Sequence, residues 1–174
     1  MSKFFEDFDY DSFWSRSEYS LKEYVGQALT AEDIESVEKE LGFKLPASYI
    51  EFMKHQNGGI PQKRYFMASG TAWVDNYISV HGILGFDSNK TFSLCGKIGS
   101  KLMIDEWEYP AIGIYFADTP SGGHDMLCLD YRKCGPEGEP EVVHVDQECD
   151  FSITFVAKDF ETFIKSLVTG DFLE

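Results

Sequence analysis

The chain has 174 residues, a length suited to one domain, and 43% of them are hydrophobic and 16% aromatic. This apolar content excludes a mostly disordered chain, and no apolar run approaches the roughly 18–20 residues that a membrane span needs. Thirty Asp and Glu against 15 Lys and Arg give a net charge of −15, which argues against nucleic acid or an anionic membrane as a direct partner. Charge alone leaves two interpretations open, simple solubility or an acidic surface for a basic partner.

Residues 1–29 form an aromatic and acidic arm, distinct from the domain predicted over residues 30–174. Aromatic side chains such as Phe5 and Trp14 alternate there with Asp and Glu. The arm either packs on the domain or stays mobile until a partner covers its aromatics. Its first residues lack the apolar core of a signal peptide, so we expect a cytoplasmic protein.

Helical signals begin at Thr30, which with Asp33 resembles a capping box. Apolar residues then recur on one helical face as far as Leu41, and Gly42 is a natural C-terminal stop. Pro46 suits the start of a second helix. The sequence Asn57-Gly58-Gly59 is expected to end that helix.

The middle of the chain changes to short apolar segments bounded by Gly, Pro or Asp, which predicts strands. The predicted strands are Tyr77–Leu84, Thr91–Cys95, Ile112–Phe116, Asp125–Tyr131, Val142–Asp146 and Phe151–Val156. A last helix follows the N-cap Asp159, with an apolar stripe that continues through Val168 to Gly170. Helices, then strands, then a helix favour a single α+β domain with a mainly antiparallel or mixed sheet of about six strands.

The four cysteines contain no CxxC pair, so we expect them to be reduced and mostly buried, without a metal or another cofactor. A zinc site is the alternative, and its ligands would be Cys128, Cys134, His144 and Cys149. That spacing matches no standard zinc module.

The Gly-rich loop from Asp118 to Asp125 is the best local candidate for chemistry. Ser121 and His124 suggest a nucleophile and a base, and the two Asp residues suggest a metal site. The competing interpretation is a hairpin whose side chains bind its own backbone. We favour the hairpin, because neighbours in sequence rarely face each other as a catalytic set. A small hydrolase stays open as a minor alternative.

A second cluster combines acids and aromatics, the composition of an interface that meets basic side chains. The candidate partner-binding residues are Glu106, Trp107, Glu108 and Tyr109, followed by Asp118, His124 and Asp125. No catalytic residue is predicted.

Two stretches resemble the SUKH superfamily. Leu41–Pro61 (LGFKLPASYIEFMKHQNGGIP) has the family's Leu-Pro step, aromatic-rich helix and Asn-Gly-Gly end. Tyr109–Arg132 (YPAIGIYFADTPSGGHDMLCLDYR) is similar to the family's strand–turn–strand core. The resemblance spans about residues 30–170.

The resemblance implies a non-catalytic α+β domain that binds another protein. By this resemblance the chain is similar to bacterial immunity proteins that neutralise toxin domains, often nucleases. It is also similar to a fungal branch of cell-wall regulators. We therefore expect an immunity protein that binds a cognate toxin, with a regulatory module linked to cell-wall processes as the alternative. The acidic charge suits a nuclease, whose substrate groove is usually basic.

Overall fold

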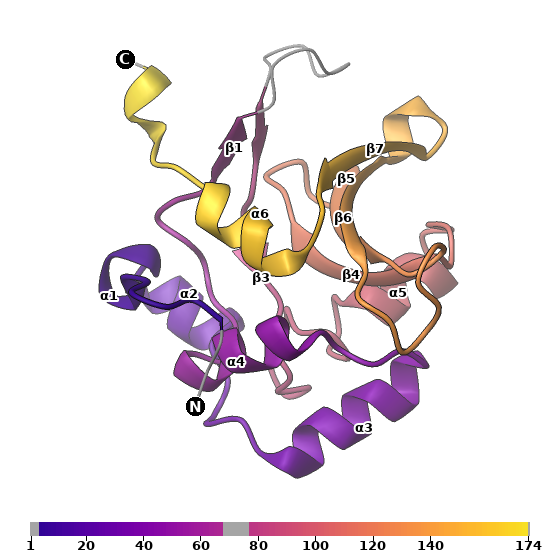
Figure 1. The fold of residues 1–174 in the computed structure, drawn as a ribbon, viewed down its shortest axis with the longest axis horizontal. Coiled ribbons are helices and arrows are strands. Elements are labelled where there is room, and N and C mark those ends of the chain that lie inside the picture. The colour runs from indigo at the N-terminus through magenta and orange to yellow at the C-terminus, as the bar shows by residue number, and fades with distance from the viewer. Residues whose placement is uncertain (1–3, 68–76, 174) are drawn as a thin grey trace.

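The computed structural model describes residues 4–67 and 77–173, which form helices around two antiparallel sheets (Figure 1). The helices are α1 (Tyr10–Phe13), α2 (Glu18–Glu23), α3 (Ala31–Leu41), α4 (Ala47–His55), α5 (Ser100–Asp105) and α6 (Phe160–Ser166). The strands are β1 (Tyr65–Met67), β2 (Tyr77–Ser79), β3 (Gly82–Ile83), β4 (Gly113–Asp118), β5 (Asp125–Asp130), β6 (Glu141–Asp146) and β7 (Ser152–Ala157). Short 3-10 turns cover Gln147–Cys149 and Gly170–Leu173. The predicted α+β class is confirmed.

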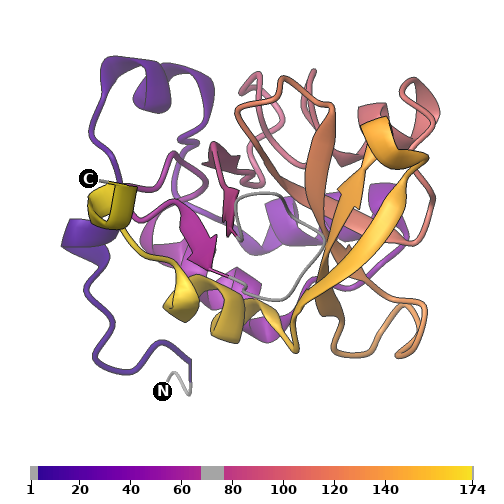
Figure 2. The same cartoon turned by 90° about the horizontal axis from the view of Figure 1, so that it is seen from above.

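The larger sheet has the order β3-β4-β5-β6-β7, and β1 and β2 form a separate two-stranded sheet. Each strand of the larger sheet pairs with its neighbour in sequence, so short loops suffice to connect β4 to β7. Figure 2 shows the arm and the C-terminal turn at one end of the molecule, with β5, β6 and β7 at the other.

Both faces of the larger sheet are covered, because successive side chains of a strand point to opposite faces. Phe116 joins the main core with Phe52 of α4 and Phe160 of α6, whereas Tyr115 joins a smaller core with Met103 of α5. The sheet therefore separates α4 and α6 on one face from α5 on the other (Figure 1).

The helix ends follow the predicted capping chemistry. Thr30 Oγ1 accepts from the amide of Asp33, while the Asp33 carboxylate accepts from the Thr30 amide. Gly42 ends α3 with a φ of 81°, a left-handed conformation that Gly adopts at little cost. Asp159 caps α6 as expected, but α6 ends at Ser166. The predicted stripe is therefore too long, since Val168 is extended and bridges to Tyr65.

Two strand predictions differ from the structure, one in part and one entirely. The segment predicted over Tyr77–Leu84 divides between the two sheets, because Val80 and His81 bond Arg64 and Asp118 instead of continuing one ladder. The segment predicted over Thr91–Cys95 is a loop that makes isolated bridges.

The last strand does not alternate regularly between the two faces of the sheet. Val143 pairs with Phe155, but Val142 pairs with Ala157, so a bulge at Val156 changes which face the strand buries. Val156 and Ala157 reach the main core, while Phe155 stays 55% exposed beyond the smaller one.

The described part of the N-terminal arm packs on the domain. Phe5, Phe13 and Trp14 are buried, and all three rings lie against Phe52 of α4. The Phe5 amide also donates to the Glu161 carboxylate at the start of α6, 2.9 Å away. These contacts make the arm part of the core.

Candidate functional site

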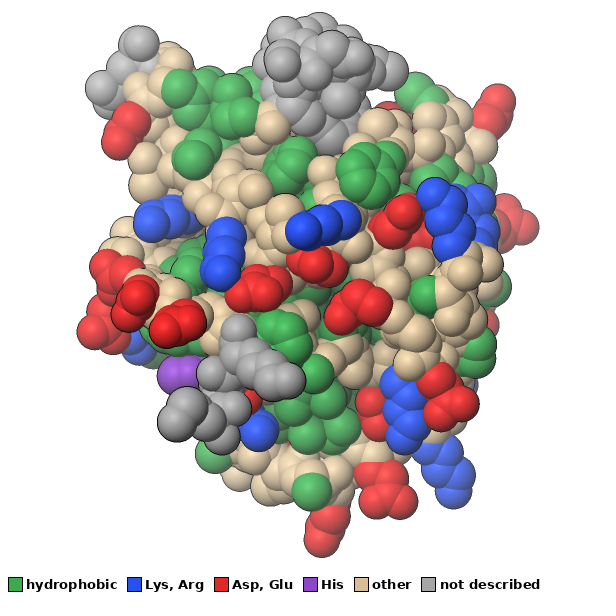
Figure 3. All heavy atoms as spheres, viewed as in Figure 1, with side chains coloured by type: hydrophobic (Ala, Val, Ile, Leu, Met, Phe, Trp, Pro, Cys, Tyr) green, Lys and Arg blue, Asp and Glu red, His purple; other side chains and the backbone are tan. Residues whose placement is uncertain are grey.

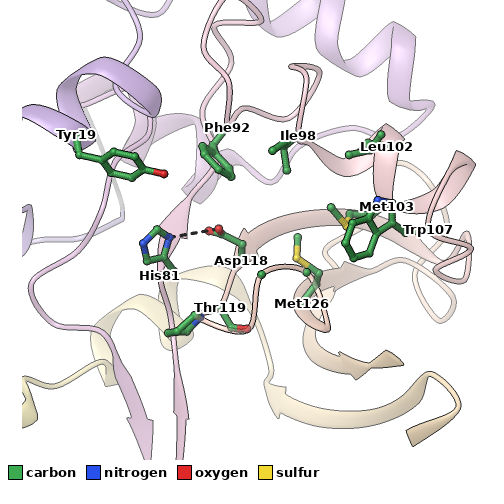
Figure 4. A pocket seen from close by; sticks show the side chains of 13 residues that line it. Tyr19, His81, Phe92, Ile98, Leu102, Met103, Trp107, Asp118, Thr119 and Met126 are labelled. Carbon is green, nitrogen blue, oxygen red and sulfur yellow. Dashed lines mark hydrogen bonds and ion pairs between the residues drawn. The ribbon is translucent and has the colours of Figure 1, made fainter. Parts of the chain in front are cut away.

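A cavity of about 470 Å³ lies between α2, α5 and the hairpin that joins β4 to β5. Apolar and aromatic side chains form most of its wall, with one imidazole and one carboxylate (Figure 4). The residues that line it are Tyr19, His81, Phe92, Ile98, Leu102, Met103, Trp107, Asp118, Thr119, Pro120, Gly122, Gly123 and Met126. A few polar groups in an apolar hollow are typical of a binding site.

One end of the cavity holds a hydrogen-bonded set of three residues. The Tyr24 hydroxyl donates to Asp118 Oδ2 over 3.0 Å and lies 2.8 Å from His81 Nδ1. Since a hydroxyl has one proton, Nδ1 of His81 must carry the hydrogen of the second contact. Burial, followed by the charge of Asp118, raises the pKa of Tyr24, which keeps that hydroxyl protonated.

Aromatic rings surround this polar end. Phe92 stacks on Tyr24 with ring centroids 4.6 Å apart, and Tyr19 is 49% exposed at the rim. In Figure 4 the hydroxyl of Tyr19 points towards the interior of the cavity, on the same side as His81. The wall here is therefore aromatic around a single carboxylate.

Trp107 forms the opposite end, beside Met103 and Met126 (Figure 4). It follows α5 in a turn where Glu108 has a φ of 63°. Gly123 of the hairpin lies so close to the indole that a Cβ there would be 2.8 Å from a Trp107 ring atom. Local backbone conformation thus sets the place of Trp107.

The hairpin residues bind one another. Ser121 Oγ accepts from the amides of His124 and Asp125, both at 3.1 Å, and lies 2.9 Å from Thr119 Oγ1. Thr119 in turn donates to Asp125 Oδ1 over 2.6 Å. Ser121 therefore gives its own proton to Thr119, and its oxygen already accepts two hydrogen bonds.

Asp125 and His124 have structural partners as well. Asp125 Oδ2 lies 2.7 Å from Nε2 of His144, which is 4% exposed. Burial would raise the pKa of Asp125, but hydrogen bonds from neighbouring side chains, first among them His144, hold it below its ordinary value. His124 Nδ1 pairs with the exposed Glu148 at 2.7 Å, so its ring is not directed at Ser121.

The structure brings some of the predicted contact residues together and separates others. Trp107 and Asp118 line the cavity, and the ring of His124 lies 6.5 Å from that of Trp107. Glu106 and Glu108 are exposed on the turn that carries Trp107. These residues remain candidates for a partner surface.

Tyr109 and Asp125 do not lie on an open surface. Tyr109 is 2% exposed and donates to the carbonyl of Gly123 over 2.5 Å. Asp125 is held by His144 and Thr119. Their part in binding would be to position the turn and the hairpin.

Sequence reasoning missed the other wall of the cavity. Tyr19, His81 and Phe92 come from segments far from Trp107 in the chain, and no local spacing connects them. The sequence signal for this wall was the density of aromatics in the arm, which does not show which segments they contact.

The cysteines differ from the expectation of mostly buried thiols. Only Cys128 is buried; Cys95 and Cys134 are partly exposed and Cys149 is exposed, all without disulfides. Within residues 4–67 and 77–173, no three His, Cys, Asp or Glu side chains are grouped to hold a metal ion. The alternative zinc site of Cys128, Cys134, His144 and Cys149 therefore has no support.

Charges of both signs are present on the face of the molecule in Figure 3. On the face in Figure 3, acidic and basic side chains lie next to each other in one band, rather than in a single acidic patch. The excess of acids is therefore no guide to a partner site on this face, and the cavity is the more specific feature.

The model of the SMI1 / KNR4 family (SUKH-1) matches residues 28–166. The chain belongs to the SUKH-1 family. The match includes His81, Trp107 and Asp118, whereas Tyr19 and Tyr24 lie before it. In this SUKH-1 protein the arm therefore completes a cavity that the family domain only partly encloses.

Two further findings accompany the family match. No curated protein matches the chain. In the part of the chain that the structure describes, no helix is both long and apolar enough to cross a membrane. The individual partner must be inferred from the surface itself.

Proposed function

We propose that this SUKH-1 domain is a non-catalytic immunity protein that binds and neutralises a cognate bacterial toxin. The observation that carries the proposal is the cavity between Trp107 and Asp118, which joins two separately predicted contact residues in one hollow. A partly exposed Trp beside a concave apolar wall is the composition of an interface hot spot. Membership of the SUKH-1 family supports a role in protein binding.

Charge complementarity supports a basic partner. The net charge of −15 attracts positively charged surfaces over a distance and raises the rate of encounter. Glu106 and Glu108 flank Trp107 and are exposed, so they are suited to basic side chains at the rim. A nuclease toxin, whose substrate groove binds phosphates, would offer such a surface.

The hairpin chemistry favours binding over hydrolysis. Ser121 accepts two backbone hydrogen bonds, and the His124 ring pairs with Glu148, so neither is arranged as nucleophile and base. Neither residue is among those that line the cavity. The loop is better explained as a support for the wall beside Trp107.

Co-expression with toxin genes encoded nearby tests the proposal. The chain should restore growth of cells that produce one of these toxins, and the purified pair should form a complex. W107A should fail to restore growth at equal protein level. F155A is the matched control, because Phe155 is an exposed aromatic on β7 that does not line the cavity. If no neighbouring toxin is neutralised or bound, the immunity proposal is wrong.

A further inference from the structure

The polar end of the cavity holds a carboxylate that pairs with no Lys or Arg among the residues that the structure describes. Among the residues described, the ionised Asp130 is paired with Arg132 and Glu161 with Lys165. Asp118, in contrast, has one described base within ion-pair distance, the His81 imidazole at 3.4 Å. Its Oδ1 is buried and has no hydrogen-bond partner in the described structure.

An unpaired buried carboxylate oxygen is costly, and most such groups in native proteins are satisfied. Here the Asp118 side chain keeps 13% of its surface exposed and lines the cavity. The Tyr24 hydroxyl occupies Oδ2 only. Because Oδ1 is buried, a cationic donor in the cavity would meet the charge of Asp118 at the exposed part of its side chain.

The surrounding wall is suited to a cationic donor. Tyr19 and Phe92 stand on either side of the space next to Asp118 and His81 (Figure 4). Aromatic faces attract cations, most strongly where water is excluded. Beyond them Ile98 and Leu102 offer an apolar wall along which a long methylene chain could lie (Figure 4).

We propose that the cavity receives a lysine or arginine side chain of the partner protein, with its charged head at Asp118 and its stem against Leu102. This inference rests on the proposed function and deepens it, because it names the chemistry that the partner must present. The size agrees, since about 470 Å³ lies within the usual range for pockets that enclose small ligands. The excess of acids across the chain also favours a positively charged ligand.

Small probes test the cavity without any partner. N-acetyl-argininamide and N-acetyl-lysinamide are titrated into the full chain while the indole N–H signal of Trp107 is followed by NMR, after assignment with W107F. N-acetyl-citrullinamide is the neutral control, because it keeps the shape of arginine without the charge. At least one cationic probe should bind about tenfold or more tightly than the citrulline compound.

Two charge-removing variants separate a local effect from the overall field. D118N should lower the affinity for the cationic probe by about tenfold or more. E35Q should change that affinity by less than about twofold. Glu35 is exposed on α3 and does not line the cavity. The indole signal of buried Trp14 reports whether D118N is folded. If D118N does not fold, F92L replaces it and should lower binding of the cationic probe alone.

Three results with probes that do bind would overturn the inference. They are equal binding of the citrulline compound, equal effects of D118N and E35Q, and tighter binding of free putrescine than of both amides. The last result would make the cavity a site for small amines. If the probes do not bind while the toxin is still captured, only this inference is overturned. If the chain binds the probes but captures no toxin, only the proposed function is overturned.

Discussion

The Asp125 carboxylate lies 2.7 Å from Nε2 of His144, and this pair fixes the hairpin that forms one wall of the cavity. Asp125 belongs to β5 and His144 to β6, so the contact ties the loop to the sheet. The same carboxylate accepts from Thr119. A loop that looked like a source of catalytic groups is thus built to hold its own shape.

Loss of this pair should destabilise the fold. D125N removes the charge that both His144 and Thr119 bind, and it should cost about 1–3 kcal/mol of unfolding free energy. Urea denaturation at pH 7 measures the change. D150N is the control, because Asp150 is exposed and left-handed, with a φ of 55° that Asn also tolerates. Equal stability of the two variants would contradict the structural role of Asp125.

The stability of the wild type relative to D130N should depend on pH. Burial would raise the pKa of Asp130, but hydrogen bonds from Arg132 lower it below its ordinary value. A lowered pKa in the folded state adds stability above the unfolded pKa of about 4, and this stability is lost as pH falls through the folded value.

Urea denaturation of wild type and D130N at several pH values checks the sign. Wild type should be more stable by about 1–3 kcal/mol at pH 7, with a gap that narrows below about pH 4. The difference between the two proteins removes the effect of the high net charge on both. A gap that widens in acid would show that Asp130 is not stabilised as the carboxylate.

Substitution at two adjacent glycines should separate backbone strain from displacement of Trp107. Gly122 and Gly123 both have positive φ values, 76° and 100°. A Cβ at Gly122 meets nothing within 4 Å, whereas one at Gly123 meets the indole of Trp107. Both G122A and G123A should lose about 1–2 kcal/mol of stability.

Only G123A should change the surroundings of Trp107. The NMR position of its indole N–H and the affinity for the toxin measure that effect. G122A should bind the toxin as wild type does, and G123A should bind it more weakly. Similar affinities of the two variants would mean that the place of Trp107 does not matter.

The arm should contribute to global stability. Trp14 is 1% exposed, and its ring centroid lies 5.3 Å from that of Phe52. W14A should therefore lower the free energy of unfolding by about 3–5 kcal/mol. Leu21 of α2 is 46% exposed, and L21A should stay within about 0.5 kcal/mol of wild type. Thermal or urea denaturation measures both. A small effect of W14A would mean that the arm is dispensable for the core.

Local signals predicted the fold best where one short segment determines the structure. The Thr30–Asp33 capping box, the Gly42 stop and the Asp159 cap need only neighbouring residues, and all three are present. Strand boundaries were less predictable because they depend on partners. Val80 and His81 look like strand residues, yet their hydrogen bonds lead to different segments.

The candidate site was predictable only in part for the same reason. Trp107 can be recognised from the acidic and aromatic residues around it, and Asp118 from its place at the start of a Gly-rich loop. Tyr19 and Tyr24 reach the site through packing of the arm, which no periodicity reveals. The place of Tyr109 next to acids likewise does not show that its ring is buried.

The most direct test of the binding role is the affinity of W107A for the toxin that the wild-type chain neutralises, measured by calorimetry or surface plasmon resonance. Truncation of a hot-spot Trp costs at least about 2 kcal/mol, so the dissociation constant of W107A should rise by about 30-fold or more. F155A should stay within about threefold of wild type. A complex that W107A leaves intact, or that F155A weakens more, would contradict binding through the cavity between Trp107 and Asp118.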